Sequence, residues 1–215
     1  MEKDERLIKH TFIIFLFLSL IFLAEWFTTG PFQKVVIAPL GEEPLKLLYP
    51  FLIYYGIIWA KREKNIYINY KETFSKTFVY PSAIAGILFG LYEYLGGASL
   101  VNILLHFSFT TIDAVLIVLW FDKVRYPYKK AGFSLIAVGI FLHSISNQYT
   151  NITSVNEGNS YLVCVAKFLI KNTPLINQWD YARVIYLIAL ALVLIYFRAY
   201  TMPEIRKKVE RKSKH

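Results

Sequence analysis

The segment Gly41-Glu42-Glu43-Pro44-Leu45-Lys46 opens a stretch of sequence that is otherwise apolar as far as Trp59. A stretch of this length and composition is typical of a helix that crosses a membrane. Charged groups at membrane depth are costly, so those that do occur there are candidates for function. We therefore expect a membrane-embedded helix with two adjacent carboxylates and a lysine near one end.

The composition of the chain agrees with an integral membrane protein. Of its 215 residues, 56% are hydrophobic and 18% are charged, and the mean hydropathy is +0.42. Soluble domains carry roughly 25% charged residues. We predict a single membrane domain over residues 1–215. The lone Cys164 excludes an intrachain disulfide and a cysteine-based metal site.

Six apolar stretches predict an all-α, polytopic helical bundle with about six transmembrane helices. They cover residues 11–27, 37–60, 78–95, 100–121, 131–147 and 181–200. The first could be a signal peptide, but Phe22 and Ala24 make a poor cleavage site. Residues 161–170 are apolar but too few to cross the bilayer as a helix, so we expect a short interfacial or re-entrant segment there.

The basic residues define an orientation. They gather at the N-terminus, in the loops 61–76 and 123–130, and in a tail at 203–215, which all fall on one side of a six-helix topology. By the positive-inside rule, both termini are cytoplasmic in a multi-pass protein of the cell membrane. The net charge of +9 then reflects topology and contact with the lipid bilayer, and we expect no nucleic acid as a partner.

Four of these helices place ionisable or amide side chains toward the extracytoplasmic side. The orientation was assigned from Lys and Arg alone, so this agreement is independent of it. We expect the side chains to meet in one water-reachable site. They are Glu42, Glu43, Glu93, His106, His143 and Asn147.

Helical spacing adds direction to this set. Lys46 follows the two glutamates by three and four residues, so it can pair with either carboxylate. Asp113 lies two turns beyond His106 and could orient it through a chain of hydrogen bonds. Two pairs at i, i+4 spacing each face one way: Phe89 with Glu93, and His143 with Asn147.

The residue types suit peptide hydrolysis. That reaction needs a base to activate water and donors to stabilise an oxyanion. A partly buried glutamate is a suitable base, and His143 and Asn147 are suitable donors. The same region could instead hold a divalent metal such as zinc, although the H-E-x-x-H pattern is absent. The candidate metal ligands are Glu43, Glu93, His106 and His143.

The motifs occur in a characteristic order: Glu42-Glu43-x-x-Lys46, Phe89-x-x-x-Glu93, His106, and His143-x-x-x-Asn147. This series resembles the PrsW family of intramembrane proteases, within the superfamily of type II CAAX prenyl proteases and bacteriocin-processing proteins. In the CAAX branch the first motif ends in arginine and the second in histidine, whereas Lys46 and Glu93 stand at those places here. The resemblance covers about residues 37–150, which we take as the catalytic core.

The resemblance implies roles for these residues. Glu42 or Glu43 would activate the attacking water with help from Glu93, and His106 would be a further member of the active site. His143 and Asn147 would stabilise the tetrahedral intermediate. It also implies a prokaryotic host and a membrane-anchored substrate cut on its extracytoplasmic side, such as an anti-sigma-factor-like single-span protein. The family has been treated both as metal-dependent and as glutamate-dependent, so no zinc is assigned.

Other interpretations of the same residues stay open. Buried Glu and His side chains could form the proton relay of a transporter, although carriers place such groups near the midplane and often have repeated halves. The chain could also be a non-catalytic scaffold, because the scaffold subunit of gamma-secretase is distantly similar to this superfamily. More simply, Glu42, Glu43 and Lys46 could mark an interfacial helix start, and His143 and Asn147 could cap a helix.

Overall fold

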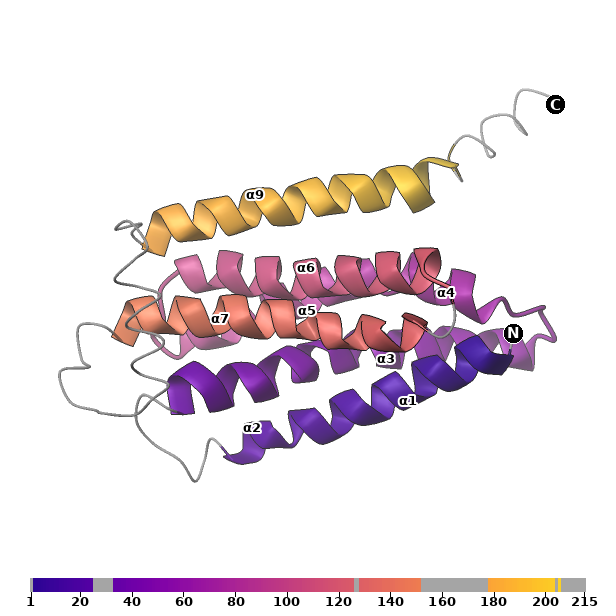
Figure 1. The fold of residues 1–215 in the computed structure, drawn as a ribbon, viewed down its shortest axis with the longest axis horizontal. Helices are drawn as coiled ribbons and strands as arrows, with labels where there is room; N and C mark the ends of the chain where they lie inside the picture. Colours follow the sequence, from indigo (N-terminus) through magenta and orange to yellow (C-terminus); the bar gives the residue numbers. More distant parts are fainter. Residues whose placement is uncertain (1, 25–32, 126–127, 152–177, 204, 206–215) are drawn as a thin grey trace.

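The computed structural model describes residues 2–24, 33–125, 128–151, 178–203 and 205, and these residues form helices and no β-strand. Figure 1 shows the long helices lying side by side along one common direction. Among them, α9 packs on α6 at one side of the bundle and α1 packs on α3 at the opposite side (Figure 1). The predicted all-α class is confirmed for the described residues.

Within the described ranges, short segments join successive helices. A four-residue helix follows α1, a π-helical turn leads into α3, and a 3-10 segment leads into α7. The α-helices are α1 (Glu2–Ser19), α2 (Ile21–Ala24), α3 (Ala38–Glu63), α4 (Tyr70–Thr77), α5 (Val79–Leu95), α6 (Val101–Lys123), α7 (Ile136–Asn151) and α9 (Gln178–Tyr196). The other segments are the π-helical turns Gln33–Ile37 and Phe197–Thr201 and the 3-10 helix Tyr128–Leu135.

Four helical segments are long and apolar enough to cross a membrane. They are Lys3–Leu23, Tyr70–Leu95, Val101–Lys123 and Trp179–Thr201. They support a multi-pass membrane protein in a lipid bilayer. Two of the six predicted spans are not in this set: α3 contains three glutamates, two lysines and an arginine, and α7 has 16 residues. The predicted re-entrant segment at 161–170 lies outside the described residues.

An aromatic cluster joins α3 to α4 and α5. The ring of Phe51 lies 4.8 Å from that of Phe78, and Phe74 lies 4.5 Å from Phe78. All three side chains are almost fully buried. Tilted and edge-on aromatic pairs at these separations stabilise packing beyond the area they bury. This cluster fixes the direction in which α3 carries its glutamates.

Two glycines allow α5 and α6 to approach closely. A Cβ at Gly86 would lie 2.6 Å from the backbone oxygen of His106, and one at Gly90 would lie 2.6 Å from Cα of Ile103. The spacing Gly86-x-x-x-Gly90 is the small-residue pattern of closely packed membrane helices. Our sequence analysis did not use this pattern, although it was visible. The contact sets the position of His106 relative to α5.

Candidate functional site

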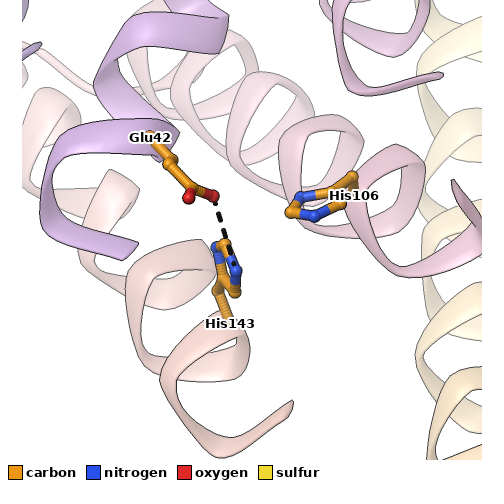
Figure 2. Close-up of side chains that lie close together, drawn as sticks. All are labelled: Glu42, His106 and His143. Atoms are coloured by element: carbon orange, nitrogen blue, oxygen red, sulfur yellow. Dashed lines mark ion pairs between the residues drawn. The ribbon is translucent and has the colours of Figure 1, made fainter. Parts of the chain in front are cut away.

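Three helices bring one carboxylate and two imidazoles together. Figure 2 shows Glu42 of α3, His106 of α6 and His143 of α7 pointing toward a common centre. One potential ligand atom from each of the three lies within 4.8 Å of the other two. All three are among the predicted site residues, and the structure brings their side chains together, whereas their roles stay a prediction.

Glu43 is the internal partner of the site. Its Oε1 accepts a hydrogen bond of 2.6 Å from Lys46 Nζ and lies 2.8 Å from His143 Nδ1. Glu43 is fully buried, and the side chain of Lys46 is buried with it. A carboxylate can only accept, so His143 carries a hydrogen on Nδ1 and donates it to Glu43. The Nε2 atom of His143 therefore points away from Glu43.

Lys46 links Glu43 to the second histidine. Its Nζ lies 2.7 Å from His106 Nδ1, and His106 Nε2 lies 2.7 Å from Glu93 Oε2. An ammonium group can only donate, so Nδ1 accepts from Lys46, and Nε2 carries the hydrogen that goes to Glu93. Both ring nitrogens of His106 are thus engaged, and the orientation of this ring is fixed by two neighbours.

Glu93 has a second partner that the sequence analysis missed. Asn102 Nδ2 donates a hydrogen bond of 3.0 Å to the same Oε2 that faces His106. Asn102 precedes His106 by four residues on α6, so the i, i+4 spacing was the signal that could have found it. Glu93 is thereby held by two side chains of one helix.

The site opens into a pocket of about 750 Å³. Glu42 and Glu93 both line it, whereas Glu43 does not. Polar side chains make up much of the remaining wall: Gln33, Lys34, Asn102 and Asn147. Of the two adjacent glutamates, only Glu42 can therefore meet a molecule that enters this pocket.

Glu42 keeps an oxygen without a hydrogen bond. Its Oε2 is buried and accepts no hydrogen bond from the described residues, and His143 Nε2 lies 3.6 Å away (Figure 2). Buried polar oxygens are usually satisfied, so an unpaired one in a polar pocket indicates a place for water or for a reacting group. Glu42 Oε2 and His143 Nε2 are therefore the atoms of this group that such a water or reacting group could contact.

A metal ion fits this arrangement poorly. A zinc site needs ligand atoms that can turn their lone pairs toward the ion. His143 Nε2 and Glu42 Oε2 could do so, but both nitrogens of His106 are already engaged with Lys46 and Glu93. An ion bound to His106 would have to displace one of these partners, and the Lys46 ammonium would repel it. The four metal ligands that the sequence analysis named also differ from this group, because it contains Glu42 and not Glu43 or Glu93.

Phe89 packs against both Lys46 and His106. The ring centroid of Phe89 lies 4.7 Å from Lys46 Nζ and 5.3 Å from that of His106, and Phe22 of α2 covers Phe89 edge-on. A cation over an aromatic face is stabilised by the ring quadrupole. Phe89 therefore provides an apolar wall that also favours the charge on Lys46.

Asp113 contacts α7, whereas we expected it to orient His106. Its Oδ1 accepts a hydrogen bond of 2.7 Å from the backbone N–H of Gly139, which lies one turn before His143 on α7. A Cβ at Gly139 would lie 2.1 Å from Asp113 Oδ2, so glycine is needed for this approach. The partners found for His106 are Lys46 and Glu93, and Asp113 acts on α7 instead.

Asn147 lines the pocket and also fixes its rim. Its Nδ2 donates a hydrogen bond of 2.8 Å to the backbone oxygen of Lys34, in the π-helical turn before α3. This bond ties the end of α7 to the start of α3, where Glu42 lies. The role of Asn147 as an oxyanion donor stays a prediction.

Comparison with protein-family models, with curated proteins and with solved structures finds no match for this chain. One fold can host many activities, so function is best inferred from the geometry and chemistry of the site.

Proposed function

We propose that this protein is an intramembrane endopeptidase of the PrsW type. It would hydrolyse a peptide bond of a membrane-associated protein or peptide near the extracytoplasmic face. The observation that carries the proposal is that Glu42 lines a polar pocket, while its buried Oε2 has no hydrogen-bond partner among the described residues and lies 3.6 Å from His143 Nε2. A carboxylate in such a position is suited to take a proton from a bound water.

The proposed reaction assigns a different task to each glutamate. Glu42 takes a proton from water, and the water oxygen attacks the peptide carbonyl carbon to give a tetrahedral oxyanion. In its imidazolium form, His143 donates a hydrogen bond from Nε2 to this oxyanion. Collapse breaks the C–N bond, and the proton held by Glu42 passes to the leaving nitrogen. The products are a carboxylic acid and an amine.

Glu43 and Lys46 position the reacting groups in this proposal. The hydrogen bond from His143 Nδ1 to Glu43 aims Nε2 at Glu42. Lys46 balances the charge of Glu43 inside the protein. Glu93 also lines the pocket, and hydrogen bonds with His106 and Asn102 fix its position. Glu93 is therefore suited to contact the substrate.

The proposal includes six membrane spans with both termini cytoplasmic. The four candidate spans would be joined by α3 and α7, whose buried ionisable residues need no contact with lipid. These residues are Glu42, Glu43, Lys46 and His143. The pocket would then open on the extracytoplasmic side, where the substrate of a PrsW-type enzyme is cut. A prokaryotic cell membrane is the expected location.

The path of the hydrogen bonds and ion pairs favours a protease over a transporter. The polar chain runs from Glu42 through His143, Glu43, Lys46 and His106 to Glu93. It begins and ends at residues of one pocket, so it does not connect two sides of a membrane. A proton-coupled carrier needs ionisable groups that continue through the bilayer.

The decisive experiment is cleavage of a single-span reporter by the purified full-length protein in lipid nanodiscs. We expect cleavage by the wild type and a loss of at least a hundredfold in Glu42→Gln. Glu63→Gln is the matched control, because Glu63 is exposed at the other end of the same helix. Equal cleavage by wild type and Glu42→Gln would remove the glutamate mechanism. Absence of cleavage in both, with a folded protein, would favour the scaffold alternative.

A further inference from the structure

A second pocket lies at the opposite end of α3 from Glu42, and the proposed proteolysis does not use it. It has a volume of about 380 Å³ and is formed by α1, α3 and α4. Its wall combines charged, aromatic and aliphatic side chains, among them Glu5, Lys9, Phe12, Tyr55, Arg62 and Tyr70. This end of the bundle carries the basic loop 61–76, so it is the side that we predict to be cytoplasmic.

The wall of this pocket changes from charged to apolar along the helix axis. On α3, Arg62 lies seven residues after Tyr55, or about 10 Å along the axis. On α1, Phe12 lies seven residues after Glu5 in the same way, with Lys9 between them. A phospholipid has this gradient, with a charged phosphate above ester carbonyls and apolar chains. The pocket therefore suits an amphiphile that lies parallel to the helices.

The charges of the rim favour an anion. Lys9 and Arg62 are cationic and Glu5 is anionic, so these three side chains sum to one positive charge. Arg62 Nη2 donates to Glu5 Oε1 at 2.7 Å and to Tyr70 Oη at 2.9 Å. This ion pair is exposed, and such pairs contribute little to stability, so the guanidinium can also bind a phosphate with its remaining donors.

A buried hydroxyl points to a polar group deeper in the pocket. Tyr55 Oη is buried and has no hydrogen-bond partner among the described residues. Its ring packs edge-on against Phe12, with the centroids 5.4 Å apart. A buried hydroxyl without a partner is costly, and an ester carbonyl below a phosphate would satisfy it.

We propose that this pocket binds one anionic phospholipid of the phosphatidylglycerol type from the cytoplasmic leaflet. Lys9 and Arg62 contact the phosphate, Tyr55 donates to an ester carbonyl, and Phe12 packs along an acyl chain. The single negative charge of this headgroup neutralises the positive charge of the rim. The lipid fills the gap between α1 and α3, so its binding stabilises the association of α1 with the bundle.

Lipid titrations of the full-length protein followed by native mass spectrometry test this proposal. Phosphatidylglycerol should bind more tightly than phosphatidylcholine with the same acyl chains. Lys9→Gln and Arg62→Gln should each lower the affinity for phosphatidylglycerol about fivefold, as expected for one basic side chain near an anionic headgroup. Tyr55→Phe should weaken both lipids alike, because both contain ester carbonyls.

Lys64→Gln is the matched control, since Lys64 is an exposed cation at the same end of α3 but is not part of the pocket wall. It should leave the lipid affinity unchanged. Arg62 also holds Glu5 and Tyr70, so Lys9→Gln, which removes an exposed charge, is the decisive variant. Equal binding of the two lipids, a preference for phosphatidylethanolamine, or equal losses in Lys9→Gln and Lys64→Gln would overturn the proposal. None of these results depends on proteolytic activity.

Discussion

His143 on α7 and Glu43 on α3 lie 100 residues apart in the sequence and share a hydrogen bond of 2.8 Å between Nδ1 and Oε1. The same oxygen accepts from Lys46 Nζ at 2.6 Å. Glu43 is therefore committed to two donors inside the protein. The neighbouring Glu42 lines the pocket and Glu43 does not, so the two adjacent glutamates differ in environment and in expected role.

Exchanging each glutamate for glutamine should separate these roles. Glu42→Gln should lower the cleavage rate by a factor of roughly 10² to 10⁴, the usual contribution of a general base, and leave the thermal unfolding midpoint almost unchanged. Glu43→Gln should lower both the cleavage rate and the unfolding midpoint. It leaves the buried Lys46 without its carboxylate, which lowers the free energy of unfolding by about 3–5 kcal/mol. Cleavage rates and thermal unfolding curves in detergent measure the two effects. A stable Glu43→Gln protein with the activity of the wild type would contradict this assignment.

A double substitution should recover stability but not activity. Lys46→Met alone leaves Glu43 as an unpaired buried charge and should destabilise the protein by about 3–5 kcal/mol. Adding Glu43→Gln removes that charge, so the double variant should be more stable than either single variant. A double-mutant cycle on the free energy of unfolding gives the coupling between the two residues. Additive losses would show that Lys46 and Glu43 do not act as a pair.

The sequence predicted the helices well where apolar stretches end at charged residues or glycines. The predicted span 78–95 corresponds to α5 at Val79–Leu95, and 100–121 corresponds to α6 at Val101–Lys123. The predicted boundaries were wrong where a helix extends beyond its apolar part. The first helix begins at Glu2 rather than at residue 11, because hydropathy detects the apolar part of a helix and not its polar first turns. The separate helix α4 was taken as part of a basic loop.

The site was predicted as a set of residues, but not as a set of partners. Helical spacing placed Lys46 within reach of both Glu42 and Glu43. In the structure, Glu43 accepts hydrogen bonds from Lys46 and from His143 of α7, and the position of α7 could not be predicted from helical spacing. The distance between helices depends on packing, such as the contact of Gly139 with Asp113, which one sequence does not reveal. For this reason the sequence left the identity of the base open.

Removal of metal ions should leave the activity unchanged. Both ring nitrogens of His106 are engaged by Lys46 and Glu93, so His106 is not free to act as a third ligand beside Glu42 and His143. We expect the purified protein to contain well under one equivalent of zinc. We also expect it to cleave its reporter at the same rate after incubation with a chelator. Loss of activity with the chelator, followed by its return on addition of zinc, would establish a metal mechanism instead.

The close contact between α5 and α6 at Gly86 should affect catalysis, although Gly86 does not line the pocket. A Cβ at Gly86 would lie 2.6 Å from the backbone oxygen of His106 and 2.9 Å from Cα of Phe107. Backbone atoms cannot move aside as a flexible side chain can, so Gly86→Ala should push α6 away from α5. His106 would then shift relative to Glu93, whose hydrogen bond of 2.7 Å crosses the same interface.

We expect Gly86→Ala to lower the cleavage rate at least tenfold while the protein still inserts into the membrane and remains folded. Gly56→Ala is the control, because a Cβ at Gly56 meets nothing within 4 Å, and its rate should equal that of the wild type. Measuring both variants with the single-span reporter, together with their unfolding midpoints, separates a displaced His106 from general instability. Equal rates for the two variants would mean that the close approach of α5 and α6 does not position the site.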